Sequence, residues 1–369
     1  MLDELEQVTH LGRKHLIALM NGSQIRRRKR SRERGRLYDT DVAKAIATVA
    51  DALDWICAER LQPALYSMAK HLEACSEMKV SSEVLDKLRL ISVSSVGRIL
   101  KTIRPAQRLP RPYPGRRSDT SAQQAVPISV IPWQQPEPEH FEVDLVHHGT
   151  PDRQGNLVCT LQFVDVLTGW SERFAIMGYS FDAVWHAIQA FRMHCPIPVR
   201  ELHSDNGSEF INHALIAVFG KEMVGVYQTR GRPGFHNDNR FVEQKNSSLV
   251  RAYLGNMPLR THAELRALTA LYEDMWLYYN LFQPVLRQTE RKAVTGPDGI
   301  IRIRRKQDRA RTPFQRLCET ALPISRETRE HLQMLYEETN PMVLKRSIHA
   351  QIDALVSLVA SKEETPYPV

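Results

Sequence analysis

A proline-rich segment divides the sequence into two halves that differ in hydrophobic period. Residues 105–138 hold eight of the 21 prolines in this chain of 369 residues. Proline fixes φ and removes a backbone hydrogen-bond donor, so this segment is predicted to be an extended, semi-rigid linker. A chain of this length also exceeds what one hydrophobic core usually organises. We therefore expect two or three domains, with a boundary near residue 139.

Behind the linker, the sequence predicts an α/β domain over residues 139–283. Three segments with the pattern of strands, at 141–149, 157–170 and 171–179, are separated by turns that contain glycine. Helical and strand-like segments then alternate along the chain. Three strands followed by such an alternation predict one mixed sheet with helices on both faces.

The charge balance favours an anionic partner. Fifty Lys and Arg stand against 42 Asp and Glu, and the pI is near 9.3, which is typical of proteins that bind nucleic acid or a membrane surface. No apolar run approaches the roughly 18 residues that span a bilayer, and the N-terminus lacks the pattern of a signal peptide. We therefore expect a cytoplasmic protein with no membrane partner, associated with the nucleoid when it binds DNA.

The five cysteines fit that compartment. They are odd in number and widely spaced, and no CxxC pair is present. We expect reduced thiols and no structural zinc.

The half in front of the linker is predicted to be all-α. Residues 1–22 contain two short amphipathic segments around a glycine turn, with Arg13 and Lys14 outside the apolar faces. This pattern resembles a helix-turn-helix that presents both cations to DNA, although any small helical hairpin has the same pattern. A helix-turn-helix normally needs a third helix and none precedes Met1, so we expect this unit to be incomplete at its N-terminus.

Residues 38–104 continue with helical apolar spacing and form a predicted helical DNA-binding region. In its last helix, Arg98 and Lys101 lie outside the apolar stripe, which makes this helix a second candidate for DNA recognition. A generic helical bundle explains the apolar pattern equally well.

Two further segments concentrate positive charge. Residues 22–36 hold eight Arg or Lys against one Glu, so the segment 23–37 is predicted to be a solvated arm. A soluble linker is the alternative reading. The cations of the arm that we expect along DNA phosphates are Arg26, Arg27, Arg28, Lys29 and Arg30.

The second segment is residues 284–323, where GIIRIRRK follows a Pro-Asp-Gly turn. It predicts a small basic β module with Arg304 and Arg305 as DNA contacts. Residues 324–369 are predicted to form C-terminal helices with no assigned role.

Three carboxylates occupy unusual places in the α/β half. Asp144 interrupts an otherwise apolar strand, where a charge is costly unless it is paired or binds metal. Asp205 follows a short strand, at the edge where α/β sheets commonly place their chemistry. Glu243 lies on the border of an apolar helix face. An Asp-Asn-Gly turn and a surface glutamate are ordinary by themselves, so the inference depends on all three together.

At these motifs the sequence resembles the DDE integrase core, which retroviral integrases share with many transposases of bacterial insertion sequences. The runs FEVDLVHHG, HSDNGSEF and NDNRFVEQKN are similar to the three acidic motifs of that family, over residues 139 to about 256. Asp144, Asp205 and Glu243 match the three acidic positions, with 37 residues between the last two. The sequence motifs FVEQKN and RTPFQRL are similar to those of the insertion-sequence members in particular.

The resemblance implies a ribonuclease H-like fold and a transposase that cleaves and joins DNA strands. The three acids would hold two Mg²⁺ or Mn²⁺ ions per active site, because hard cations take oxygen ligands and phosphodiester displacement is charge-rich. DNA ends and target DNA would be the partners, with a homo-oligomer assembled on DNA and no small-molecule substrate. Supporting roles in orienting ligands or phosphates fall to Asn206, Asp238 and Asn239, for which loop capping is an equal alternative.

The sequence departs from the family pattern after the third acid. Retroviral integrases carry lysines one and two helical turns beyond it, where this chain has Ser247 and Val250. Lys245 and Arg251 are the nearest cations, at different positions on the helix. Two alternatives to the transposase remain: a DNA-binding regulator derived from one, and a ribonuclease H-like nuclease that cleaves without joining strands.

Overall fold

The computed structural model describes residues 2–22, 37–103, 137–205, 223, 225–232, 236–295, 301–319 and 324–363. The chain divides into two compact units, Met1–Asp39 and Thr40–Val369. The predicted basic arm at 23–37, apart from Leu37, and most of the proline-rich linker lie outside the described residues. Within the described part, no helix combines the length and the apolarity that a membrane crossing requires.

The first unit contains two short helices, α1 (Leu2–Thr9) and α2 (Arg13–Met20), as the sequence predicts. Leu16 is the one buried residue in the two helices. Arg13, a predicted DNA contact, forms an ion pair with Asp3 across the turn. The backbone N–H of Arg13 also donates to Glu6 Oε1 at 3.1 Å, so this residue ties the two helices together.

The second unit begins with the helical region. Its elements are α3 (Thr40–Ala52), α4 (Ala58–Leu61), η1 (Gln62–Ala64), α5 (Leu65–Ala74), α6 (Ser82–Leu90) and α7 (Val93–Ile103). Helix α7 buries Val96 and Leu100, and Arg98 and Lys101 are exposed, as the apolar stripe predicts.

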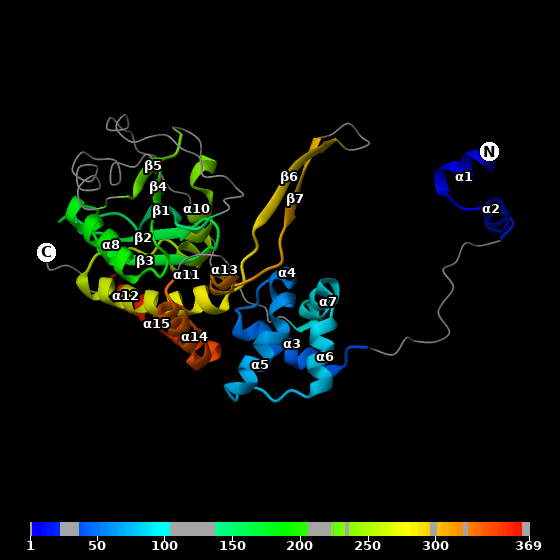
Figure 1. Ribbon diagram of the computed structural model, residues 1–369, viewed down its shortest axis with the longest axis horizontal. Helices are drawn as coiled ribbons and strands as arrows, with labels where there is room; N and C mark the ends of the chain where they lie inside the picture. The colour runs from blue at the N-terminus through cyan, green and yellow to red at the C-terminus, as the bar shows by residue number, and fades with distance from the viewer. Residues whose placement is uncertain are drawn as a thin grey trace. The chain divides into compact units, whose positions relative to one another are not determined.

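The α/β half is built on a five-stranded sheet in the order β3-β2-β1-β4-β5 (Figure 1). The strands are β1 (His140–His147), β2 (Val158–Asp165), β3 (Ser171–Met177), β4 (Glu201–Ser204) and β5 (Tyr227–Arg230). The first three form an antiparallel meander, β4 is parallel to β1, and β5 is parallel to β4. This order and direction confirm the predicted ribonuclease H-like mixed sheet.

Helices cover both faces of the sheet. On one face, Phe163 of β2 stacks on Phe191 of α8 (Phe181–His194), with ring centroids 4.0 Å apart. On the other face, Thr160 of β2 shares a 2.5 Å hydrogen bond with Tyr272 of α12 (His262–Leu277). That second face also carries α10 (Arg240–Lys245), whose first turn packs on β2. Alternation along β1 places Asp144 on the face of α10.

Short helical segments complete the core. The 3-10 helix η3 (His236–Asn239) leads into α10, which continues as the π-helix η4 (Asn246–Arg251) and α11 (Ala252–Leu254). A second π-helix, η5 (Tyr278–Phe282), extends α12.

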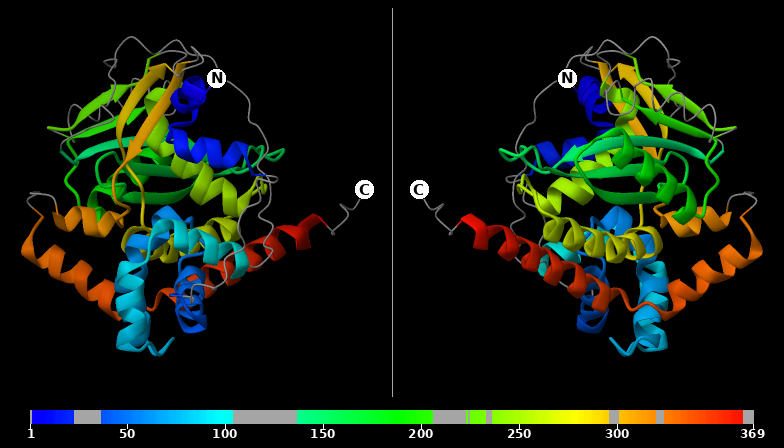
Figure 2. Two further views of the ribbon diagram at one scale, coloured as in Figure 1. Left: turned by 90° about the vertical axis from the view of Figure 1, so that its right-hand side faces the viewer. Right: turned by 90° about the vertical axis from the view of Figure 1, so that its left-hand side faces the viewer.

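The remaining elements are the two-stranded sheet of β6 (Gln288–Thr295) and β7 (Ile301–Gln307), then α13 (Pro313–Glu319), α14 (Arg326–Glu338) and α15 (Pro341–Glu363). The predicted C-terminal helices are therefore present. Helix α15 packs on α12 and on α3, and so holds the helical region to the α/β half (Figure 2).

Polar contacts strengthen this junction. The hydroxyl of Tyr253 donates to Asp54 Oδ2 at 2.7 Å, and Lys345 Nζ lies 2.8 Å from Asp51 Oδ1. Arg60 donates to the carbonyl of Pro284 at 2.6 Å.

Candidate active site

Two of the three predicted acids come from neighbouring parallel strands. Strand β1 pairs with β4 in a register that sets Val143 opposite Ser204. Asp144 and Asp205 are the next residues along β1 and after β4, so the same register sets them side by side where β4 ends against the middle of β1. Asp144 is half-buried and Asp205 is exposed.

The third acid is carried to the same face by α10. Phe241 and Val242 pack against Val164 of β2 and Val166 just after it, in one buried cluster. Glu243, the next residue, is exposed at the edge of this contact. The packing of Phe241 and Val242 thus fixes where α10 lies, and the position of Glu243 along α10 then fixes where this acid is placed.

The electrostatics of Asp144 report on this arrangement. Burial first, and then the negative charges of Asp205 and Glu243, raise the pKa of Asp144 to about 8, against two hydrogen bonds that lower it. Acids from β1, from the end of β4 and from α10 therefore interact electrostatically. Repulsion of this kind is what a bound cation relieves.

The donor chemistry of this site fits a hard divalent cation. All three side chains offer carboxylate oxygens, the ligands that Mg²⁺ and Mn²⁺ prefer. In the described part of the chain, no three His, Cys, Asp or Glu side chains are grouped closely enough to hold a metal ion as they stand. The three carboxylates would therefore have to move closer together to share an ion.

Asn246 is a site residue that the sequence reasoning missed. Its Nδ2 donates to Asp144 Oδ2 at 2.6 Å, while the backbone N–H of Leu145 donates to Asp144 Oδ1 at 2.9 Å. Asn246 is buried, with 5% of its surface exposed. It lies three residues after Glu243, on the same side of the helix, and that spacing is the signal that could have identified it.

Glu142 is a second missed residue, and it is fully buried on β1. Its Oε2 accepts hydrogen bonds from the backbone N–H groups of Phe241 at 2.6 Å and Val242 at 2.9 Å. These donors belong to the first turn of α10, which has no intrahelical acceptors for them. Burial raises the pKa of Glu142 to about 7, against these hydrogen bonds and the nearby Arg240 and Arg287.

The predicted supporting residues have structural contacts. Asp238 accepts two hydrogen bonds of 2.9 Å from the Arg232 guanidinium. Hydrogen bonding to Arg232 holds the pKa of Asp238 below its usual range. Asn239 donates through Nδ2 to the carbonyl of Val143 at 3.2 Å, which ties the start of α10 to β1. Asn206 lies outside the described residues.

Comparisons with known proteins place the chain in a family. No family model matches the sequence. The chain is 31% identical over 297 residues to "Uncharacterized protein y4rM" of Sinorhizobium fredii (strain NBRC 101917 / NGR234), an alignment that covers 80% of this chain and 83% of that protein. The chain belongs to the y4rM family.

Two solved structures are similar to parts of this member of the y4rM family. The catalytic core domain of BIV integrase has a TM-score of 0.30 at 18% identity, covering 49% of this chain and 94% of that one. A chain of the simian T-cell lymphotropic virus intasome, solved in complex with the PP2A regulatory subunit B56 gamma, has a TM-score of 0.29 at 14% identity, covering 58% and 70%.

The two cations that follow Glu243 differ in their surroundings. Lys245 is half-buried, and burial together with Arg287, Arg173 and Arg60 holds its pKa well below the usual range. Arg251, near the end of the π-helix, is also half-buried. The positive charges of the three arginines thus oppose the protonated form of Lys245 at this position.

Proposed function

We propose that this protein is a metal-dependent DNA transposase of the integrase type, a polynucleotidyl transferase that cleaves and joins DNA strands. Asp144, Asp205 and Glu243 are the proposed catalytic acids. The observation that carries the proposal is the electrostatic interaction of Asp144 with both other acids. The three acids come from three separate elements, which are β1, the end of β4 and α10.

The three acids would hold two Mg²⁺ or Mn²⁺ ions, which stabilise the charge on the attacking and leaving oxygens of a phosphodiester when bound. The residues of the chain orient those ligands. Asn246 Nδ2 donates to Asp144 Oδ2 and the N–H of Leu145 donates to Oδ1. These two hydrogen bonds fix the orientation of the Asp144 carboxylate. Glu142 fixes α10 against β1 and thereby sets how far Glu243 lies from Asp144.

The proposed substrate is DNA at the ends of a mobile element, together with target DNA. No nucleophilic serine or tyrosine is required, because a 3′-hydroxyl freed by hydrolysis attacks the target strand directly. The helical units would contact the ends through Lys14, Arg98 and Lys101, of which Arg98 and Lys101 are exposed on α7. Arg13 and Arg251 are further proposed contacts. Assembly of two or more copies on paired ends completes the proposal.

The decisive experiment compares Asp144→Asn with the parent on labelled duplexes that carry the DNA flanking the gene, with Mg²⁺ and a supercoiled plasmid as target. The proposal requires strand joining by the parent and none by the variant. Asp182→Asn is the matched control, since Asp182 is an exposed acid in the first turn of α8. It should join strands as the parent does.

Other outcomes identify the alternatives. Cleavage without joining would mark a nuclease of the same fold. Binding to the duplexes with neither reaction, by parent and variant alike, would mark a DNA-binding regulator and refute the catalytic assignment.

A further inference from the structure

The strands β6 and β7 form an antiparallel ribbon with four cations on one face and two on the other. The register sets Lys292 opposite Arg304, Val294 opposite Arg302 and Glu290 opposite Lys306. Directly opposed residues of an antiparallel pair share a face. We call this side, with Lys292, Arg302, Arg304 and Lys306, the cationic face. Arg305 is set opposite Arg291 and lies on the reverse side.

The cationic face is open to solvent. All four of its cations are exposed, including Lys292, which forms an ion pair with Glu290 on the same face. On the reverse side, Ala293 and Arg305 are exposed as well. No described residue of β6 or β7 is buried, and Figure 1 shows the ribbon extending away from its base near α13. An isolated two-stranded ribbon is marginally stable in water, so a binding partner would stabilise it.

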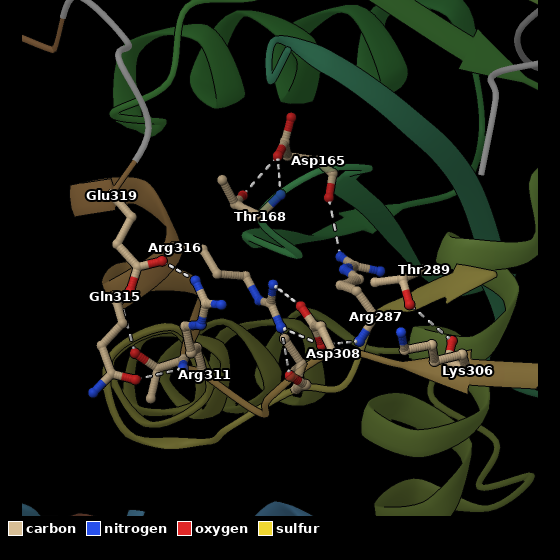
Figure 3. A network of polar contacts seen from close by, with 12 residues as sticks. Asp165, Thr168, Arg287, Thr289, Lys306, Asp308, Arg311, Gln315, Arg316 and Glu319 are labelled. Carbon is tan, nitrogen blue, oxygen red and sulfur yellow. Dashed lines mark hydrogen bonds and ion pairs between the residues drawn. The ribbon is translucent and has the colours of Figure 1, made fainter. Parts of the chain in front are cut away.

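The base of the ribbon is held by a network of hydrogen bonds and an ion pair. The backbone N–H of Arg287 donates to Asp308 Oδ1 at 2.9 Å, and the N–H of Asp308 donates back to the carbonyl of Arg287 at 2.9 Å. From α13, Arg316 donates to both oxygens of Asp308, at 2.6 and 3.1 Å, and to the carbonyl of Val285 at 2.9 Å (Figure 3). These contacts clamp the two strands together where they leave the body.

The same base touches the candidate active site. Arg287 donates to the carbonyl of Asp165 at the end of β2, at 3.3 Å. Its guanidinium also lies over the ring of Phe241, 4.8 Å from the ring centroid. Phe241 is two residues before Glu243 on α10, so one side chain links the ribbon to the helix that carries a proposed catalytic acid.

Cations continue beyond the ribbon. Arg309, just after β7, lines a cavity of about 720 Å³ together with Arg89 and Tyr66 of the helical region. The guanidinium of Arg89 lies 5.6 Å from the centroid of the Tyr66 ring. A polyanion that leaves the foot of the ribbon would therefore meet further positive charge.

We propose that the cationic face of the ribbon lies in the major groove of duplex DNA and contacts its phosphates. The major groove is about 12 Å wide and admits a two-stranded ribbon, whose strands lie about 4.8 Å apart. Alternate residues of a strand are spaced by about 6.6 Å, so Arg302, Arg304 and Lys306 form an extended row of charge along the groove. The proposal deepens the proposed function, because it names the surface that holds the DNA substrate.

The test measures DNA binding and not catalysis, so it succeeds or fails separately from the proposed function. Fluorescence anisotropy of a labelled 30-base-pair duplex is recorded over a range of salt concentrations, in EDTA. The full chain is compared with a triple variant, Arg302→Thr, Arg304→Thr and Lys306→Thr. Threonine favours strands, so the ribbon keeps its backbone preference. Arg305→Thr is the matched control, with the same chemical change at a neighbouring position on the reverse face.

The slope of log affinity against log salt changes by about 0.9 for each phosphate contact. We expect the triple variant to reduce the slope by about 2 to 3, a single Arg304→Thr variant to reduce it by about 1, and Arg305→Thr to leave it unchanged. Arg304→Lys should retain the parental slope, because it keeps the charge. Equal losses from Arg304→Thr and Arg305→Thr would overturn the assignment to one face. An unchanged slope in the triple variant would overturn the proposal altogether.

Discussion

Replacing Asp144 with asparagine should stabilise the folded protein when no divalent metal is present. Burial and the neighbouring acids raise the pKa of Asp144 from 3.8 to about 8. At pH 7 the unfolded chain carries this carboxylate ionised, whereas the folded chain must protonate it or hold an unfavourable charge. With about 1.36 kcal/mol for each pKa unit, the cost to folding at pH 7 is at most about 4 kcal/mol.

Two corrections reduce that figure. Asparagine cannot accept from both Asn246 and the N–H of Leu145, so one hydrogen bond worth about 1 kcal/mol is lost. The effective dielectric around a half-buried carboxylate further weakens the penalty. We therefore expect a stabilisation of roughly 1 to 2 kcal/mol at pH 7.

The sign of the pH dependence follows from the raised pKa. An acid whose folded pKa lies above its unfolded value destabilises the fold only above the unfolded pKa, and the penalty grows until the pH reaches the folded pKa. The penalty that Asp144→Asn removes should thus be about twice as large at pH 8 as at pH 5.5, so the gain in stability should shrink toward pH 5.5. Thermal and urea unfolding in EDTA measure it, with Asp182→Asn as control. Destabilisation by Asp144→Asn at pH 8, or a gain that does not shrink toward pH 5.5, would refute the electrostatic reasoning.

Three further substitutions test the surroundings of the site. Glu142→Ala should lower stability by about 1 to 3 kcal/mol in urea unfolding, because it leaves two buried N–H groups of α10 unpaired, and Glu142→Gln should restore most of that loss. Asn246→Ala should lower kcat for strand joining at least tenfold with a smaller change in KM, since it frees the carboxylate of Asp144; an unchanged kcat would contradict the orienting role. Gly169→Ala should destabilise the fold by more than about 1 kcal/mol, since Gly169 has φ +75° and an added Cβ would collide with the Arg287 guanidinium; a melting temperature equal to that of the parent would contradict it.

The sheet and its acids were predictable because each depends on a short stretch of sequence. The alternation around Asp144 predicts a strand, and the meander that follows needs only local turns. Asp205 is predictable for the same reason, since it follows directly after a strand. The side-by-side placement of these two residues depends on β4 pairing with β1, which a mixed sheet of this order provides.

The contacts that orient the acids were not predictable from the same patterns. Glu142 lies on the same strand as Asp144, two residues before it, and no pattern in the sequence separates the roles of the two acids. The hydrogen-bond partners of Glu142 are backbone N–H groups about 100 residues away. Asn246 belongs to a polar run that has no apolar period of its own. Long-range pairs of this kind have no local signature, because they are created by the packing of Phe241 and Val242 on the sheet.

The ribbon shows the same limit at a finer scale. The run of cations predicts a basic β module, and Arg304 and Arg305 are equivalent in composition and charge. Alternation along β7 puts them on opposite faces, but only the register with β6 shows that Arg304 shares its face with Lys292. The foot of the ribbon also has a register irregularity between Gln288 and Glu290, which composition does not reveal.

The most direct measurement of the central claim is the anomalous scattering of a crystal of this protein soaked in Mn²⁺. The account predicts two anomalous peaks about 3.5 to 4 Å apart, coordinated by oxygens of Asp144, Asp205 and Glu243. Crystals of Asp144→Asn should lose at least one peak. An ordered site in which these three side chains bind no Mn²⁺ at saturating concentration, or peaks bound only elsewhere on the chain, would contradict the account.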